Sequence, residues 1–320
     1  MTDLFAAVDL GGTKIAAMLA DASGQVVAQK TIPTRAHEGP AAVLDRTADL
    51  VQELAAQAGR SPVALGMGLP GLVDLPNGVV RFLPNLPTHW RDVPARAQLS
   101  ARIGCPVYLL NDVRLAALGE LVFGHGRSVG TMAFFAIGTG IGGGVVIDGR
   151  LRLGRLGAAG ELGHQTILPD GPRCGCGSTG CLETLASGPA ITAEGVRLLL
   201  SGQAPALHRL VDGRPEQVTP AKMAQAAAEG DQAVREALTR AATYLGIGIA
   251  NVVTILHPEL VVLGGGVAGI GSLLFDTVRA VVPARVGMFP ADDVRIEPSL
   301  LGPQAGLWGG IALAQRRGEV

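Results

Sequence analysis

The chain has 320 residues, enough for about two domains at roughly 100–200 residues each. Hydrophobic residues make up 48% and charged residues 17%, so a large core can form and global disorder is excluded. A formal net charge of −1 provides no basic field, which argues against nucleic-acid binding. The first residues show no signal-peptide pattern, so we expect a cytoplasmic protein whose cysteines stay reduced.

The first part of the chain predicts a strand meander, a helix and two further strands. Short apolar runs that end in turn residues predict strands, and apolar residues at helical spacing between glycines predict a helix. The expected strands are 4–9, 15–19, 25–32, 63–69 and 107–110, and the expected helices are 39–59 and 111–123. The proline-rich residues 83–90 predict a loop.

The rest of the chain begins with the same order of elements. The expected strands are 132–137, 145–147 and 260–263, and the expected helices are 189–200, 220–229, 231–253, 272–282 and 303–317. Residues 138–144 predict a loop, and residues 151–183 are irregular and carry most of the polar chemistry. Because both parts open with a strand, a Gly-Thr turn and a strand, we expect two related α/β lobes with a cleft between them.

Residues 128–147 carry no charge and are long enough to cross a bilayer. The glycine-rich turn in the middle of this segment favours two buried strands around a loop instead. We therefore expect no membrane partner.

Three glycine-rich segments follow predicted strands. The first, Asp9 to Lys14, combines Gly11 and Gly12 with the hydroxyl of Thr13 and a lysine, which suits an anion, although an ordinary hairpin turn explains it equally well. Residues 138–143 and 264–269 match G-x-G-x-x-G, but neither has the context of a dinucleotide fingerprint, and no P-loop motif occurs. Together the segments suggest a nucleotide held by backbone groups.

Four potential metal ligands lie within a short stretch: His164, Cys174, Cys176 and Cys181. Three thiolates and one imidazole form a closed tetrahedral Zn²⁺ site, and the intervening glycines permit the tight turns that it needs. The alternative is a set of reduced structural cysteines. We favour a structural zinc, because free cysteines rarely cluster in a polar loop.

Several carboxylates stand beside these motifs. Asp112 follows a strand and Asn111 at the expected start of a helix, where capping is the simpler role and general-base catalysis the functional one. Glu161 and Glu183 flank the predicted zinc ligands. They are either solvated loop charges or, if the metal fixes the loop, groups that grip the hydroxyls of a polyol.

These residues together resemble the ROK family, named for repressors, uncharacterised reading frames and sugar kinases, over essentially the whole chain. The motifs that carry the resemblance are Asp9-Leu-Gly-Gly-Thr-Lys14, Gly68-Leu-Pro-Gly71, Leu110-Asn-Asp112, Gly138-Thr-Gly-Ile-Gly-Gly-Gly144, Gly160-Glu-Leu-Gly-His164, Cys174-Gly-Cys-Gly-Ser-Thr-Gly-Cys-Leu-Glu183 and Leu263-Gly-Gly-Gly266. The Glu-x-x-His pattern combined with three cysteines is the most specific of these.

The resemblance implies an α/β, two-lobed actin-like (ribonuclease H-like) ATPase fold with the active site in the cleft. Residues 1–112 and 303–320 would form the small lobe, and residues 113–302 the large lobe with the zinc loop. The implied reaction is phosphoryl transfer from Mg-ATP to a hexose hydroxyl, with glucose favoured over mannose, fructose, N-acetylglucosamine and N-acetylmannosamine. The family further implies a homo-oligomer, either a dimer or a tetramer.

The resemblance also implies roles for individual residues. Asp112 would be the catalytic base. The sugar would be held by Gly71, Asn85, Asn111, Asp112, Glu161, His164 and Glu183. Asp9 would orient the hydrated Mg²⁺, and ATP would meet Gly11, Gly12, Thr13, Lys14, Gly138, Thr139, Gly140, Gly142, Gly265 and Gly266. His164 would ligate zinc through one ring nitrogen and meet the sugar through the other.

One position departs from the family pattern: Arg114 stands where members often carry Asn, two residues after the base. Two other functions stay open. A sugar-responsive repressor would carry a helix-turn-helix domain, whereas only eight residues precede Asp9 here. A catalytically dead sensor is disfavoured because Asp9, Lys14 and Asp112 occur together with the sugar-binding residues.

Overall fold

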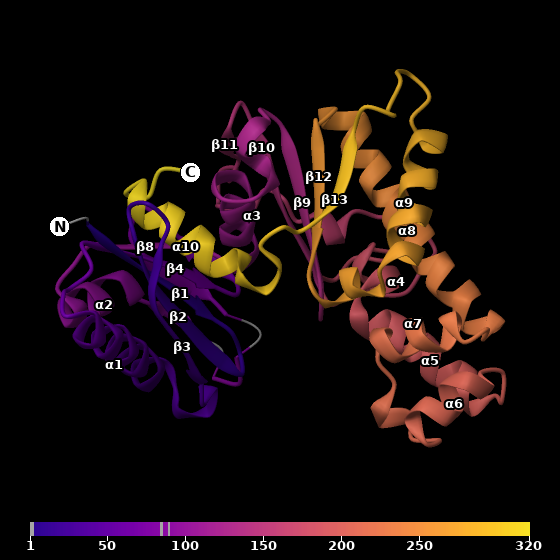
Figure 1. The fold of residues 1–320 in the computed structure, drawn as a ribbon, viewed down its shortest axis with the longest axis horizontal. Helices are drawn as coiled ribbons and strands as arrows, with labels where there is room; N and C mark the ends of the chain where they lie inside the picture. The colour runs from indigo at the N-terminus through magenta and orange to yellow at the C-terminus, as the bar shows by residue number, and fades with distance from the viewer. Residues whose placement is uncertain (1–2, 84–85, 89) are drawn as a thin grey trace. The chain divides into compact units, whose positions relative to one another are not determined.

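A computed structural model describes residues 3–83, 86–88 and 90–320. The chain forms two compact units, one built from residues 1–128, 145–160 and 300–320 and the other from residues 129–144 and 161–299. Figure 1 shows the elements of both units. These boundaries differ from those of the predicted lobes, because the helix after Asp112 and the segment 145–160 belong to the first unit.

The first unit contains a five-stranded mixed sheet in the order β3-β2-β1-β4-β8. Strand β1 pairs antiparallel with β2 and parallel with β4, and β8 continues the parallel side. The strands are β1 (Leu4–Leu10), β2 (Lys14–Asp21), β3 (Val26–Pro33), β4 (Ala64–Leu69) and β8 (Val107–Asn111). The parallel strands therefore end at one edge, where Asp9 and Asn111 lie.

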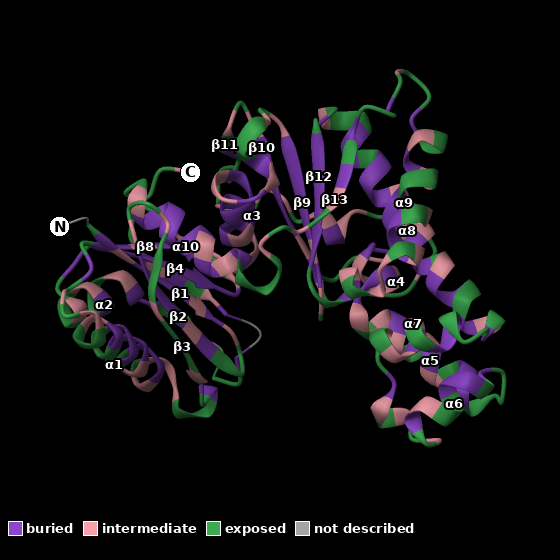
Figure 2. Ribbon diagram, viewed as in Figure 1, coloured by how far each residue is buried: buried purple, intermediate pink, exposed green. Residues whose placement is uncertain are grey.

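Helices cover this sheet. Helix α1 (Pro40–Ala58) buries one apolar face and ends at Gly59, whose φ of 68° suits a residue without Cβ. The other helices are α2 (Ala95–Ile103), α3 (Asp112–Val122) and α10 (Ala305–Gln315), and a small antiparallel sheet consists of β5 (Leu72–Asp74), β6 (Val79–Phe82) and β7 (Arg91–Val93). Figure 2 shows that the strands β1 and β4 are almost wholly buried.

Helix α10 comes from the C-terminal end of the chain and packs backbone to backbone through glycines. A Cβ on Gly309 would lie 1.7 Å from the Leu115 carbonyl oxygen of α3, and one on Gly119 would lie 2.3 Å from that of Ala305. A Cβ on Gly66 of β4 would lie 2.1 Å from the Gly310 carbonyl oxygen. Only glycine allows this close approach of α3, α10 and β4.

The second unit holds a sheet with the same strand order as the first, β11-β10-β9-β12-β13. Its strands are β9 (Met132–Ile137), β10 (Ile141–Ile147), β11 (Arg150–Leu151), β12 (Leu260–Gly264) and β13 (Arg295–Pro298), of which β11 and the end of β10 fall in the first unit. Strand β12 is parallel to both β9 and β13. The repeated order confirms the prediction of two related α/β halves.

Six α-helices complete the described part of the second unit: α4 (Glu183–Ala186), α5 (Gly188–Leu200), α6 (Pro205–Val211), α7 (Pro220–Ala228), α8 (Gln232–Leu256) and α9 (Ser272–Arg285). Helix α8 is the one described helix that is long and apolar enough to cross a membrane. Its most apolar window is 56% buried, as in the core helix of a globular unit. The uncharged segment 128–147 contains β9 and β10, two strands joined by a short turn, as predicted.

Some predictions of secondary structure were wrong. The loop predicted at 138–144 is shorter, because β10 already begins at Ile141 and Gly142 lies within it. Glycine has a low propensity for strands, so the glycine-rich residues 141–144 did not predict the strand that forms there within the sheet. Helices α2 and α6 and strands β5 to β7 and β13 were missed, because short elements give weak periodicity.

Replacing Gly309 with Ala should lower the thermal midpoint by about 4 °C or more, since overpacking at a fixed backbone costs about 1–3 kcal/mol. Differential scanning fluorimetry measures this. The matched control is Gly287→Ala, because nothing lies within 4 Å of a Cβ at that exposed position. Equal midpoints for the two variants would contradict the packing account.

Candidate functional site

The edge of the first sheet brings two carboxylates together. Asp9 lies near the end of β1, and Asp112 follows the end of β8. Burial, together with the negative charge of Asp112, raises the pKa of Asp9 to about 6, and Lys14 opposes this rise. A Cβ on Gly306, at the start of α10, would lie 3.0 Å from Oδ2 of Asp9. The carboxyl group of Asp9 is therefore enclosed and short of positive charge.

Asn111 is the N-cap of α3. Its Oδ1 accepts hydrogen bonds from the backbone N–H groups of Val113 (3.1 Å) and Arg114 (3.3 Å). Asp112 is the first residue of the helix, and its Oδ1 accepts from the N–H of Val113 at 2.9 Å. The capping role weighed for Asp112 is thus performed by Asn111, which is the residue type favoured there.

The turn from Gly11 to Lys14 joins β1 and β2, and its residues Gly12, Thr13 and Lys14 are exposed. The buried Thr34 braces this turn: its hydroxyl donates to the Gly11 carbonyl at 2.7 Å, and its N–H donates to the Thr13 carbonyl at 2.9 Å. The role of Thr34 could not be predicted from the sequence, because a lone threonine at the end of a strand carries no signal.

The second unit has a corresponding edge at the ends of β9 and β12. The N–H of Gly138 donates to the Gly140 carbonyl at 2.9 Å, which forms a tight turn. The N–H of Gly188, the first residue of α5, donates to the Gly138 carbonyl at 2.8 Å. Gly265 has a φ of 84°, and a Cβ there would lie 2.3 Å from the Ile137 carbonyl oxygen. The glycine turn, the start of α5 and Gly265 therefore all lie at the ends of β9 and β12.

Glu183 connects this turn to the cysteine loop. Its Oε2 accepts from the N–H of Ile141 at 2.8 Å, and its Oε1 lies 3.9 Å from the Sγ of Cys174. A Cβ on Gly140 would lie 2.3 Å from Oε2 of Glu183. The carboxylate of Glu183 thus holds the start of β10 in place. This structural role comes in addition to the contact with the sugar that the sequence predicts.

The four predicted metal ligands converge. One ligand atom from each of His164, Cys174, Cys176 and Cys181 lies within 4.8 Å of the others. The Sγ of Cys174 is 3.6 Å from Nδ1 of His164, and the Sγ atoms of Cys176 and Cys181 are 3.7 Å apart. Tetrahedral zinc, with bonds of about 2.0–2.3 Å, separates its ligand atoms by about 3.5–3.8 Å. The donor set and its spacing therefore fit zinc.

The two nitrogens of His164 face different groups. Nδ1 faces the cysteine cluster, and Nε2 lies 4.0 Å from Oε2 of Glu161. Gly163 allows the loop to reach this place, since a Cβ there would lie 1.9 Å from the Ile141 carbonyl oxygen. The second unit thus gathers Glu161, His164 and the cysteines on a loop that packs against β10.

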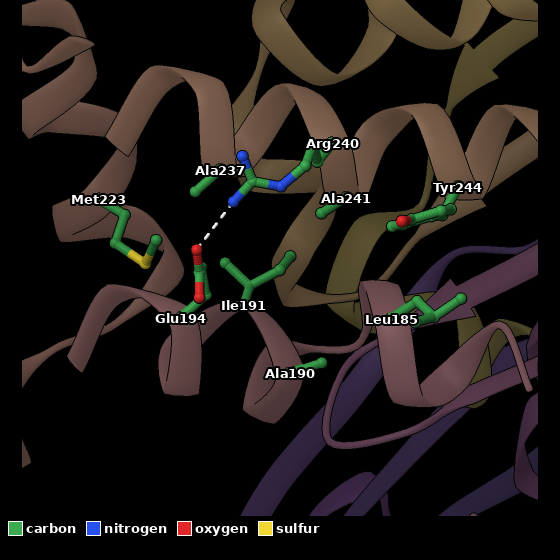
Figure 3. A pocket seen from close by; sticks show the side chains of 9 residues that line it. All are labelled: Leu185, Ala190, Ile191, Glu194, Met223, Ala237, Arg240, Ala241 and Tyr244. Carbon is green, nitrogen blue, oxygen red and sulfur yellow. Dashed lines mark hydrogen bonds and ion pairs between the residues drawn. The ribbon is translucent and has the colours of Figure 1, made fainter. Parts of the chain in front are cut away.

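Asn85, predicted to bind the sugar, lies outside the described residues. A cavity of about 300 Å³ lies between α4, α5, α7 and α8. Figure 3 shows the side chains that line it, among them Arg240, which donates to Glu194 at 2.8 Å. None of the predicted site residues lines this cavity.

The ROK family profile matches residues 5–317, and the chain belongs to this family. It is 36% identical over 318 residues to a glucokinase of Thermotoga maritima, covering 97% of this chain and 96% of that protein. It is also 32% identical over 310 residues to a xylose repressor of Caldicellulosiruptor bescii, covering 96% of this chain and 76% of the repressor.

Among solved structures, the chain resembles a ROK family glucokinase from Streptomyces griseus in complex with glucose and AMPPNP. The TM-score is 0.83 with 32% identity, and the match covers 98% of this chain and 99% of that one. The likeness confirms the predicted actin-like α/β fold.

Asp9→Asn should stabilise the protein measured without nucleotide or metal. The folded state holds the Asp9 proton more tightly than the unfolded state, so wild-type stability declines as pH rises from about 4 to about 6. Above pH 6 the thermal midpoint of the variant should be about 4 °C higher than that of wild type, which corresponds to about 1–2 kcal/mol after allowance for solvent screening. Near pH 4 the two midpoints should be equal. Thermal melts against pH test this. The control Asp276→Asn, at an exposed position, should show no such trend.

Proposed function

We propose that this protein is an ATP-dependent hexose kinase that converts glucose and ATP to glucose 6-phosphate and ADP. The observation that carries the proposal is the acidic pair Asp9 and Asp112 at the sheet edge beside the glycine turn, in a chain similar over nearly its whole length to proteins named glucokinase. Asp112 is the general base in this proposal.

The chemistry needs few groups. The hydroxyl of the sugar gives its proton to the carboxylate of Asp112 as its oxygen attacks the γ-phosphorus of ATP. The bond from that phosphorus to the β–γ bridging oxygen breaks, and ADP leaves with the electron pair. Asp112 suits this role because it lies at the first position of α3, at the edge of the sheet beside Asp9, while Asn111 serves as the N-cap of the helix.

Asp9 fits a divalent cation. Its carboxyl group is enclosed and its pKa is raised by burial and by Asp112, so a positive charge nearby would favour the ionised form. We assign Asp9 to the orientation of hydrated Mg²⁺. When bound, Mg²⁺ neutralises charge on the phosphates.

The two glycine turns suit ATP. Gly11 to Lys14 present exposed backbone groups, a hydroxyl and an ammonium group, and the turn Gly138 to Gly140 lies against the start of α5, where the helix dipole favours negative charge. We assign the phosphates to these turns and the adenosine to Gly265 and Gly266. Gly142, inside β10, is the weakest of the predicted contacts.

The sugar-binding assignment follows the polar groups beside these turns. We propose that Gly71, Asn111 and Asp112 of the first unit hold hydroxyls, as do Glu161, His164 and Glu183 of the second. A structural Zn²⁺ on Nδ1 of His164 and the three cysteines would fix the ring, so that Nε2 is the nitrogen available to the sugar.

The relatives named xylose repressors favour a second candidate, a sugar-binding regulator without phosphoryl transfer. Turnover with Mg-ATP separates the two. A cytoplasmic location and a homo-oligomeric state stay predictions. Light scattering of the purified protein tests the oligomeric state.

Asp112→Asn should lower kcat by about 10³-fold or more while the dissociation constant for glucose changes by less than about threefold, because the amide keeps the shape but cannot accept the proton. Steady-state kinetics and calorimetry measure the two quantities. Turnover within a few-fold of wild type would show that another group is the base.

Cys176→Ser should lose the metal and lower the thermal midpoint, because metal-binding energy is also folding energy. Elemental analysis of purified wild type should give about one zinc per chain. Cys105→Ser is the matched control, since Cys105 lies outside the cluster. Wild-type protein that folds and turns over without zinc would refute the assignment.

A further inference from the structure

Arg114 is a buried cation in an unfavourable place. It is 3% exposed and lies in the first turn of α3, where the helix dipole disfavours positive charge. Burying a guanidinium costs free energy unless hydrogen bonds compensate for the lost water. Helix formation alone therefore does not account for an arginine at this position, and the hydrogen bonds of its guanidinium group must be considered.

The guanidinium of Arg114 joins two segments of the first unit. Nη1 donates to Oδ1 of Asn111 at 2.8 Å, and Nε donates to the carbonyl of Ala159 at 2.9 Å. Asn111 directly precedes the proposed base, and Ala159 ends the segment that leads within two residues to Glu161. Arg114 therefore ties the end of β8 to the loop that carries a proposed sugar ligand.

These bonds also decide which way the Asn111 amide points. Its Oδ1 meets three donors, the N–H groups of Val113 and Arg114 and the guanidinium, so that atom must be the oxygen. Nδ2 donates to the Gly71 carbonyl at 3.3 Å. Its second N–H has no partner among the described residues, and the side chain is partly exposed. Asn111 can therefore offer substrate a donor only.

We propose that Arg114 is a positioning residue that locks Asn111 as a hydrogen-bond donor for a sugar hydroxyl oxygen and holds the Ala159 segment in register with it. This inference rests on the proposed function and extends it. A sugar hydroxyl that accepts a hydrogen bond from Nδ2 of Asn111 can still donate its own proton to a carboxylate. A sugar that lacks this hydroxyl loses the hydrogen bond from Asn111 and should bind poorly. Arg114 acts on binding through Asn111 and through the Ala159 segment.

The test is a double-mutant cycle on glucose KM and kcat with Arg114→Met, Asn111→Ala and both together. Arg114→Met should raise KM about tenfold with kcat changed less than threefold. Because part of the effect of Arg114 passes through Asn111, KM of the double variant should rise by less than the product of the two single effects. Multiplicative losses in the double variant would overturn the proposal, as would an unchanged KM in folded Arg114→Met.

Two further variants separate positioning from folding. Arg114→Lys keeps the charge but cannot serve both acceptors, so KM should stay raised; full rescue would show that charge alone suffices and would overturn the two-acceptor role. Arg127→Met is the matched control, since exposed Arg127 also donates to a backbone carbonyl, that of Val122, and should leave KM unchanged. A KM shift in this control as large as that of Arg114→Met would also overturn the proposal.

If wild-type protein binds glucose but shows no turnover, the kinase proposal fails, and the same cycle is measured on the glucose dissociation constant by calorimetry. Loss of coupling in that cycle overturns the role of Arg114 independently. Wild-type protein that binds neither glucose nor another hexose overturns both.

Discussion

The first unit depends on a close backbone contact among β4, α3 and α10. Gly66, Gly119 and Gly309 each face a carbonyl oxygen at a distance that excludes any Cβ. This contact brings the end of the chain against its beginning, and it sets Gly306 beside the carboxylate of Asp9. The same helix α3 begins at Asp112. The distance between the two carboxylates is therefore governed by packing that occurs one to two turns further along each helix.

The repeated strand order explains why both units carry a glycine turn at the edge of a sheet. In each sheet two neighbouring strands joined by a glycine turn stand beside parallel strands that end at the same edge. The first unit adds carboxylates and a lysine to that edge. The second adds the start of α5 and a loop on which ligand atoms of His164 and three cysteines lie within 4.8 Å of one another. Similar scaffolds thus carry different chemical groups.

Much of this could be predicted from the sequence. The apolar runs gave most strands, and the spacing of His164, Cys174, Cys176 and Cys181 predicted a cluster that the structure brings together. Strand β10 was concealed, because its glycines lack strand propensity. The packing glycines 66, 119 and 309 could not be distinguished from flexible ones, since their partners lie far along the chain. The cap at Asn111 and the brace at Thr34 likewise depend on tertiary neighbours.

The central claim is that the groups around Asp9 and Asp112 support phosphoryl transfer to a hexose. The most direct measurement is ADP release by the purified protein with Mg-ATP and a panel of glucose, mannose, fructose, N-acetylglucosamine and N-acetylmannosamine. We expect turnover that requires both the divalent cation and sugar, with the highest kcat/KM for glucose. A folded, zinc-loaded protein that binds sugar but releases no ADP above background with any of the five would contradict it.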